Sequence, residues 1–281
     1  MITANYNGKE YQQLHIKIDD RVASITLDNA PVNVLGGKMI KELTQVLGDL
    51  SGDTAIKVIV FDSINPDFFI AHVDINILEE KDILDELGKA APEGLNIFQA
   101  VGEMIRKQPQ VTIVKLKGIA RGGGAEFVAA ADMSFASLQR GKLGQCEALM
   151  GIIPGGGATQ YLSSKMTRGR VLEVILGADV FDAVTAERYG WINRALHHDE
   201  IDTFVQQLAQ NVANLPEGVI AAMKKVLPPT RNTAGFQLEH DAWAGLAFTA
   251  ETAGIMTLAM LHGAQTVEGE LKLEQLLRGL K

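Results

Sequence analysis

The sequence predicts an α/β fold, and two observations support this prediction. Short runs rich in β-branched residues alternate with segments of helical periodicity. Alternation of this kind is typical of α/β folds rather than of separate helical and sheet domains. The composition, 47% hydrophobic and 21% charged, is that of a folded protein. A chain of 281 residues suffices for one large domain, or for a domain with a helical extension.

The first two thirds of the chain contain the expected strands. They are the β-branched runs at 21–28, 55–63, 110–118 and 131–137. Two helices are expected between them, at 38–50 and 95–109, because their apolar residues recur with helical spacing. The second ends at a proline, as helices often do. The charged segment 79–94 is interpreted as a helix or flap, although most charged runs are ordinary solvated surface.

After about Gly169 the strands are expected to stop. Four successive helices are predicted there, at 169–179, 185–196, 202–215 and 216–227. The apolar run 250–261 is best explained by helix packing within an oligomer.

Charge and cysteine content exclude several classes of protein. The 26 basic and 34 acidic residues give a net charge of −8, without basic clusters, so neither nucleic acid nor membrane is an expected partner. Cys146 is the single cysteine, which rules out an internal disulfide and favours a reducing compartment. The N-terminal segment lacks a signal-peptide pattern, and no apolar run is long enough to span a bilayer. A cytoplasmic location is expected.

Three consecutive glycines, 122–124, lie between a predicted strand and an apolar helical segment. Glycine lets a ligand approach the main chain closely, and free amides at a helix start attract negative charge. Such a turn suits an oxygen that becomes negative during a reaction. A close contact between helix and strand would explain the glycines equally well. Neither this turn nor the glycines at 155–157 fit the dinucleotide-binding pattern G-x-G-x-x-G.

Two glutamates follow these patterns, each among apolar neighbours. Glu126 comes directly after the first glycine turn, and Glu147 precedes the second. Buried carboxylates have shifted pKa values, and a pair can supply one acid and one base at neutral pH. For Glu126, a charge that merely complements the helix dipole is the alternative.

Five ordered stretches of the sequence resemble the crotonase (enoyl-CoA hydratase/isomerase) superfamily. They are LDNAPVNVLGGKMIKEL, PDFFIAHVDI, KGIARGGGAEFVAAADMSFAS, LGQCEALMGIIPGGGATQYL and GRVLEVILGADVFDAVTAERYGWINRAL. One glycine motif alone would be weak evidence, whereas five in the family's order are specific. The resemblance covers most of residues 15–230.

The resemblance implies a crotonase-like spiral of ββα repeats over residues 1–200. Residues 201–281 would form a C-terminal helical region that makes homotrimers, often paired into hexamers. The implied substrate is an acyl-CoA thioester, and no separate cofactor is expected because coenzyme A is part of that substrate. No metal pattern such as H-E-x-x-H occurs in the sequence.

The resemblance also assigns roles in the site. Backbone amides of Val73 and Gly123 would form an oxyanion hole for the thioester oxygen. Glu147 would deliver a proton to the α-carbon of a 2-enoyl-CoA, and Glu126 would orient and deprotonate the attacking water. The residues expected to bind substrate around the first amide are Ala71, Asp74, Ile75 and Asn76.

Three residues depart from the family pattern. His72 replaces a glycine, and a ring that points away from the substrate is favoured over a new catalytic imidazole. Arg121 replaces a small or apolar residue; it either pairs with a nearby acid, which is favoured, or contacts an anionic group on the substrate. Cys146 replaces a proline and is expected to be a buried, inert thiol.

The resemblance leaves other activities open. Double-bond isomerisation, thioester hydrolysis and C–C cleavage can use the same enolate site, and fold does not choose among them. A catalytically silent family member is an alternative of a different class.

Overall fold

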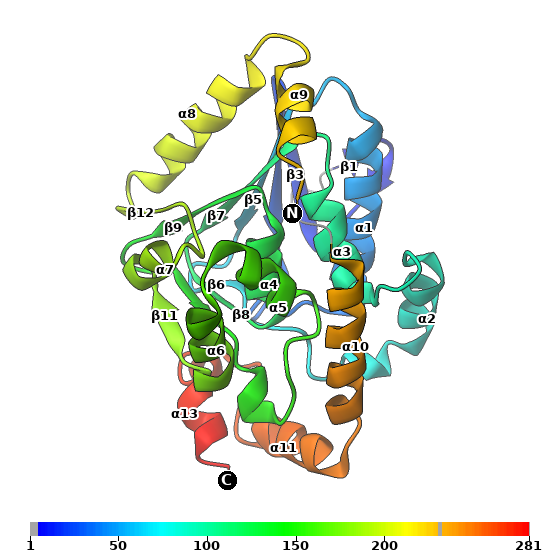
Figure 1. Cartoon of the computed structure of the whole chain (residues 1–281), viewed down its shortest axis with the longest axis vertical. Coiled ribbons are helices and arrows are strands. Elements are labelled where there is room, and N and C mark those ends of the chain that lie inside the picture. Colours follow the sequence, from blue (N-terminus) through cyan, green and yellow to red (C-terminus); the bar gives the residue numbers. More distant parts are fainter. Residues whose placement is uncertain (1–4, 230–231, 281) are drawn as a thin grey trace.

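The computed structural model describes residues 5–229 and 232–280, which form two sheets surrounded by helices (Figure 1). The six-stranded sheet has the order β12-β9-β7-β5-β4-β3 and the four-stranded sheet the order β11-β10-β8-β6. The strands of the larger sheet are β3 (Leu14–Asp19), β4 (Val22–Leu27), β5 (Val58–Ser63), β7 (Val111–Leu116), β9 (Met133–Ser137) and β12 (Arg194–Leu196). Those of the smaller sheet are β6 (Phe68–Ile70), β8 (Ile119–Arg121), β10 (Lys142–Gly144) and β11 (Val180–Asp182). A separate hairpin pairs β1 (Asn5–Tyr6) with β2 (Lys9–Glu10).

Consecutive strands alternate between the two sheets. In each pair β5/β6, β7/β8 and β9/β10, the first strand joins the larger sheet and the second joins the smaller one, and helices follow. The neighbouring strands of successive repeats run parallel. The predicted spiral of ββα repeats is therefore confirmed.

The helices complete the layers. The helices before residue 190 are α1 (Gly37–Gly52), α2 (Lys81–Ala90), α3 (Ile97–Arg106), α4 (Gly123–Ala130), α5 (Ala158–Lys165), α6 (Arg168–Gly177) and α7 (Ala183–Tyr189). The C-terminal helices are α8 (Ile201–Ala213), α9 (Val219–Val226), α10 (Thr233–Ala247), α11 (Ala250–Leu261), α12 (Val267–Glu270) and α13 (Leu273–Arg278). Two short 3₁₀ helices are η1 (Ile77–Glu79) and η2 (Glu147–Met150).

The larger sheet is covered on both faces, which explains its apolar strands. Helix α1 turns its apolar stripe, including Met39 and Leu43, toward the main core. Helix α8 packs Val205 and Ala209 against the opposite face, where Val58 and Val60 of β5 also lie. A strand buried on both faces reads as a continuous apolar run, as VIVF does at the start of β5.

The prediction that strands stop near Gly169 was wrong. Strand β11 pairs antiparallel with β10, and β12 pairs parallel with β9. The segment 185–196, predicted to be one helix, instead ends its helix at Tyr189, because Gly190 adopts a left-handed conformation (φ 81°) and reverses the chain. Strands of three residues have no β-branched run to reveal them, since backbone pairing alone defines them.

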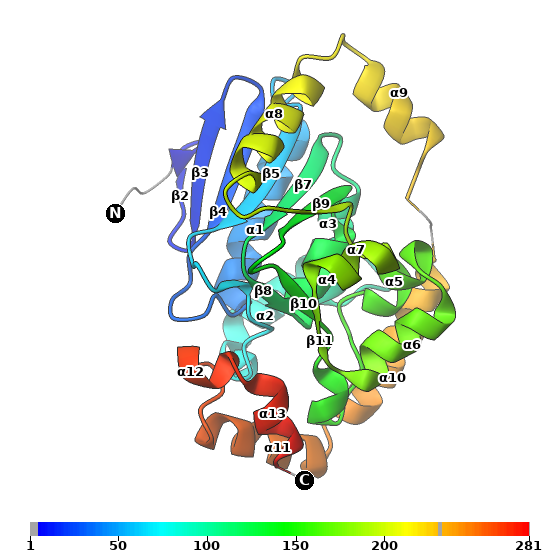
Figure 2. The same cartoon turned by 90° about the vertical axis from the view of Figure 1, so that its left-hand side faces the viewer.

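The last helices extend beyond the sheets. In Figure 2, α9 stands apart at one end of the molecule, while α11, α12 and α13 gather at the other. No single helix among the described residues is long and apolar enough to cross a bilayer. Helices α10 and α11 reach that length and composition only as a pair bent by 75°.

Candidate active site

Three neighbouring strands of the smaller sheet lead into the predicted site. Strands β6, β8 and β10 are parallel, so their carboxyl ends lie at one edge of the sheet. Residues 71–75 follow β6, residues 122–126 follow β8 and residues 145–147 follow β10. Ligands of α/β proteins commonly bind at such an edge. The topology thus brings together segments that are far apart in the sequence.

Val73 and Gly123 lie in contact with each other. A Cβ atom built on Gly123 would come 2.5 Å from Cγ2 of Val73. The polar backbone groups on either side of the Val73 N–H are hydrogen-bonded. The His72 carbonyl accepts from Leu35 N at 2.8 Å, and Asp74 N donates to Leu35 O at 3.1 Å. Within the described part of the chain, the N–H groups of Val73 and Gly123 have no acceptor. The two amides are therefore available to a ligand oxygen.

Each glycine of the triplet is required for a different reason. Gly122 has φ 49°, a left-handed conformation, and a Cβ there would lie 3.0 Å from Oε1 of Glu147. Gly123 leaves room for Val73. Gly124 lets α4 approach β6, since a Cβ would lie 2.7 Å from Cβ of Ile70. Close packing is therefore confirmed as one explanation of the triplet, and main-chain access for a ligand stays a prediction.

Glu126 is buried in the first turn of α4, and the second glycine turn holds it. Its Oε1 accepts from Gly156 N at 2.8 Å and from Ala158 N at 3.0 Å, at the start of α5. Its other oxygen lies toward Gly123, 3.9 Å from a Cβ built there. Glu126 is thus fixed by one oxygen, and its other oxygen lies between Gly156 and Gly123.

Glu147 begins η2 on the other side of the glycine triplet, and it is also buried. With its amide nitrogen facing Glu147, Gln145 donates to both carboxylate oxygens, at 2.9 and 3.0 Å. Glu147 and Glu126 line the same cavity together with Gly122 and Gly123. The structure therefore brings the two predicted glutamates and both predicted amides to one place.

Burial shifts the pKa values of both glutamates upward. It raises the pKa of Glu147 to about 7, with the charge of Glu239 adding to the effect. Burial, followed by the negative charges of Glu147 and Glu239, holds the pKa of Glu126 well above its usual range, although the two amides at Oε1 oppose this. The pair can therefore retain a proton near neutral pH.

Glu239 of α10 does not line the cavity, but it holds the glycine turn that also binds Glu126, and sequence reasoning missed it. It accepts from Gly157 N at 2.6 Å and from Thr159 N at 2.9 Å. Along the second glycine turn, four successive amides thus bind Glu126 and Glu239 alternately. Nothing in the surrounding sequence, LEHDAW, distinguishes Glu239 from a surface helical acid.

Both ring nitrogens of His72 are occupied by this chain. Nε2 lies 2.9 Å from Glu270 Oε1, and Nδ1 lies 2.6 Å from the carbonyl oxygen of Val73. Burial lowers the pKa of His72, but the contacts with Glu270 and with the Val73 carbonyl outweigh it, so that the pKa is raised.

Arg121 pairs with acids, which is the alternative favoured from the sequence. Its side chain is 1% exposed and does not line the cavity. Nε lies 2.5 Å from Glu274 Oε1, Nη2 donates to the Glu270 carbonyl at 2.8 Å, and Nη1 lies 3.4 Å from Glu270 Oε2. These contacts leave the guanidinium no access to a substrate anion.

The four residues predicted to bind substrate divide into two groups. Asp74 and Ile75 line the cavity. Ala71 does not: it is buried behind the cavity among Val32, Val34, Phe68 and Ile119. Asn76 is exposed at the start of η1 and is likewise not a lining residue. Substrate binding by Ala71 and Asn76 therefore stays a prediction, which the lining of the cavity does not support. Cys146 is buried at the cavity wall, and burial raises its pKa well above the usual range.

The cavity has a volume of about 400 Å³ and runs from the glutamates between α2, α3, α10 and α11. Its wall away from the carboxylates is apolar. Three aromatic rings form part of it, with centroids 6.4 Å apart for Phe98 and Trp243 and 5.8 Å apart for Trp243 and Phe248.

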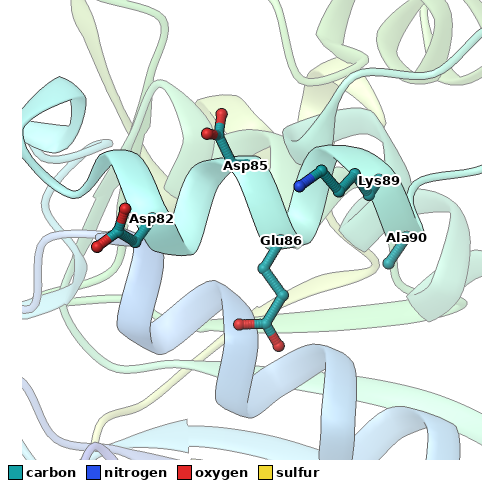
Figure 3. A pocket seen from close by; sticks show the side chains of 5 residues that line it. All are labelled: Asp82, Asp85, Glu86, Lys89 and Ala90. Carbon is teal, nitrogen blue, oxygen red and sulfur yellow. The ribbon is translucent and has the colours of Figure 1, made fainter.

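A second, shallow depression lies on the outer side of α2, away from the glutamates. Figure 3 shows the carboxylates of Asp82, Asp85 and Glu86 pointing apart from one another. Glu86 is paired with Lys41 at 2.6 Å. These acids do not converge on a ligand, and no group of three or more metal-ligating side chains occurs within residues 5–229 and 232–280.

Comparisons with known proteins agree with this architecture. The sequence profile described as enoyl-CoA hydratase/isomerase matches residues 17–250. A solved structure from Streptomyces avermitilis, titled as a candidate enoyl-CoA hydratase, is 54% identical, with a TM-score of 0.94 over 96% of this chain and 98% of that one. The short-chain-enoyl-CoA hydratase of Clostridium acetobutylicum is 27% identical over 87% of this chain and 89% of the relative. The carnitinyl-CoA dehydratase of Proteus mirabilis is 26% identical over 92% and 94%.

The two-sheet spiral and these matches define an enzyme of the crotonase superfamily. Within it, the chain belongs to the enoyl-CoA hydratase/isomerase family. The resemblance drawn from the five ordered motifs is thereby confirmed.

Proposed function

We propose that this enzyme adds water across the double bond of a 2-enoyl-CoA thioester. The observation that carries the proposal is the adjacency of the free Val73 and Gly123 amides to two buried glutamates in one cavity. The relatives named as hydratases support this assignment.

The chemistry follows from the geometry. The two amides hydrogen-bond the thioester oxygen and stabilise the negative charge that it gains as the enolate forms. In the reactive form of the pair the one proton lies on Glu147 and Glu126 is ionised. Glu126, fixed through Oε1, then accepts a proton from water with its other oxygen while the water oxygen bonds to the β-carbon. Glu147, whose pKa of about 7 keeps it partly protonated, donates a proton to the α-carbon. One water is consumed, and proton exchange between the carboxyl groups restores the starting state.

We assign the apolar end of the cavity to an uncharged acyl chain. The wall formed by Phe98, Trp243, Phe248 and Met256 has no cationic group, and Arg121 is bound to acids elsewhere. Burying a carboxylate against this wall without a partner would be costly. The expected substrates therefore have alkyl or aryl chains.

The test is a panel of 2-enoyl-CoA thioesters of increasing chain length, followed by loss of the enoyl absorbance. Wild type should hydrate an apolar member of the panel, and a carboxylated chain of equal length should be poorer. Glu126→Gln and Glu147→Gln should each lower kcat by about 10²–10⁴, the usual contribution of an acid or base.

Two results would redirect the assignment. A harmless Glu126→Gln beside an inactive Glu147→Gln would indicate double-bond isomerisation, which needs one proton carrier. Tight thioester binding without turnover of any panel member would indicate a silent family member.

We also propose that the chain assembles into homotrimers, alone or as a dimer of trimers. Large apolar side chains stay exposed on the C-terminal helices; among them are Val226 (74%), Leu227 (71%), Leu238 (70%), Phe248 (67%) and Leu261 (76%). Monomeric proteins seldom leave such a surface in water.

A further inference from the structure

A buried ionic network connects the C-terminal helices to the two segments that carry the free amides. It comprises His72, Arg121, Glu270 and Glu274, which we call the C-terminal brace. His72 directly precedes Val73, and Arg121 lies two residues before Gly123.

Glu270 is the centre of the brace. Its Oε1 binds His72 Nε2 at 2.9 Å, and its Oε2 lies 3.4 Å from Arg121 Nη1. Its backbone carbonyl also accepts from Arg121 Nη2 at 2.8 Å. Glu270 is fully buried, so no water competes for these contacts. One carboxylate therefore binds both amide-bearing segments.

Gln265 adds further contacts to the segment that carries the Val73 amide. Gln265 lies at the turn before α12. Its side-chain oxygen accepts from Ile75 N at 2.7 Å, and its backbone N–H donates to Glu270 Oε1 at 2.8 Å. The segment 72–75 is thus bound at one end by Glu270 of α12 and at the other by Gln265 of the turn before that helix. His72 in turn holds the Val73 carbonyl through Nδ1.

The composition of the brace argues for a positional role. Buried charges are costly to desolvate and give little net stability compared with apolar packing. Two acids face an arginine and a histidine whose pKa is raised, so the charges balance. Such a network fixes the positions of its side chains relative to one another.

We propose that Glu270 is a positioning residue that sets the spacing of the two oxyanion-hole amides. It binds the residue before the first amide and the arginine before the second. The proposal rests on the oxyanion role assigned above to Val73 and Gly123.

The experiment compares Glu270→Gln with Glu268→Gln, a matched change on the exposed face of the same helix, where the side chain is 86% exposed. Glu270→Gln keeps the side-chain shape and removes the charge. We expect kcat for the best enoyl thioester to fall about 10–100-fold, less than the 10²–10³ lost with a whole oxyanion donor. KM should change less than about threefold, since the contacts of the acyl chain with the apolar wall remain. Glu268→Gln should match wild type.

A second readout does not depend on hydration. Hexanoyl-CoA labelled with ¹³C at its carbonyl is bound to each protein, and the carbonyl stretch is measured by difference infrared spectroscopy. Strong hydrogen bonds from the amides lower this frequency. In Glu270→Gln it should move toward the value for free thioester, whereas Glu268→Gln should leave it unchanged.

Glu274→Gln provides a graded variant, because within residues 5–229 and 232–280 the Glu274 side chain binds Arg121 and no other group. Glu274→Gln should show a smaller shift of the carbonyl frequency and a smaller loss of kcat than Glu270→Gln. It also replaces Glu270→Gln as the test if that variant does not fold. An unchanged carbonyl frequency in a folded Glu270→Gln, or in Glu274→Gln alone if the first variant fails, would overturn the proposal. If wild type hydrates no thioester yet the frequency shifts as expected, the brace stands and the hydratase assignment fails.

Discussion

Activity and stability place opposing demands on Glu126 and Glu147. Burial favours the protonated carboxyl, whereas catalysis needs one ionised group beside one protonated group. Their raised pKa values express this conflict. Local sequence allowed the pair to be predicted, because each acid lies among apolar neighbours beside a glycine turn.

Glu147→Gln should therefore stabilise the fold while abolishing turnover. An unfolded glutamate loses its proton near pH 4.5, but Glu147 keeps its proton up to about pH 7 when folded. The folded state binds more protons in this window, so wild-type stability falls as pH rises from about 4.5 to 7. Glutamine has no proton to lose. The variant should gain on the order of 1–3 kcal/mol at pH 7.

Urea denaturation of both proteins between pH 4 and 8 measures this difference. The gap should close toward pH 4, where the carboxyl is protonated in both states. A gap that stays constant with pH would contradict a titrating Glu147.

At the scale of elements, most long periodic segments were predicted and the short ones were not. Two long elements were also missed, namely β3 with six residues and α10 with fifteen. Strands β4, β5, β7 and β9 and helices α1 and α3 have continuous apolar patterns, and each was predicted. Strands β6, β8 and β10 have three residues each and no pattern of their own, yet their carboxyl ends place the site. The contacts of Glu239 and Glu270 join residues 80–198 positions apart, a separation that no local pattern encodes.

The contact between α4 and β6 offers a test of element packing. Gly124→Ala puts a methyl group against the carbonyl and side chain of Ile70, and neither can move without shifting β6. The variant should lose about 1–3 kcal/mol of stability, the usual cost of overpacking. Gly48→Ala, in an open position of α1, should gain about 1 kcal/mol from helix propensity.

Chemical denaturation of the two alanine variants makes the comparison direct, since both add one methyl group. If Gly124→Ala were as stable as wild type, the close approach of α4 to β6 would not be what requires glycine there.

The whole molecule presents its apolar C-terminal helices outward, and assembly would cover them. The double variant Leu238→Glu/Leu261→Glu should convert trimers or hexamers into monomers, because charges in an apolar interface are costly. Ile64→Glu, at a residue 58% exposed far from these helices, is the control. Light scattering coupled to size exclusion gives the mass of each. A wild type that is monomeric at micromolar concentration would refute the assembly.

The brace also gives the molecule an order of assembly. Glu270 lies 198 positions after His72, so ribosomes make both amide-bearing segments long before the carboxylate that joins them. The sheets and the glutamates would already be in place in an emerging polypeptide, while His72 and Arg121 still lacked their shared anion. We expect translation intermediates that stop before Glu270 to transform bound acyl thioesters more slowly than the full chain does, so that full competence for chemistry is acquired only late in synthesis.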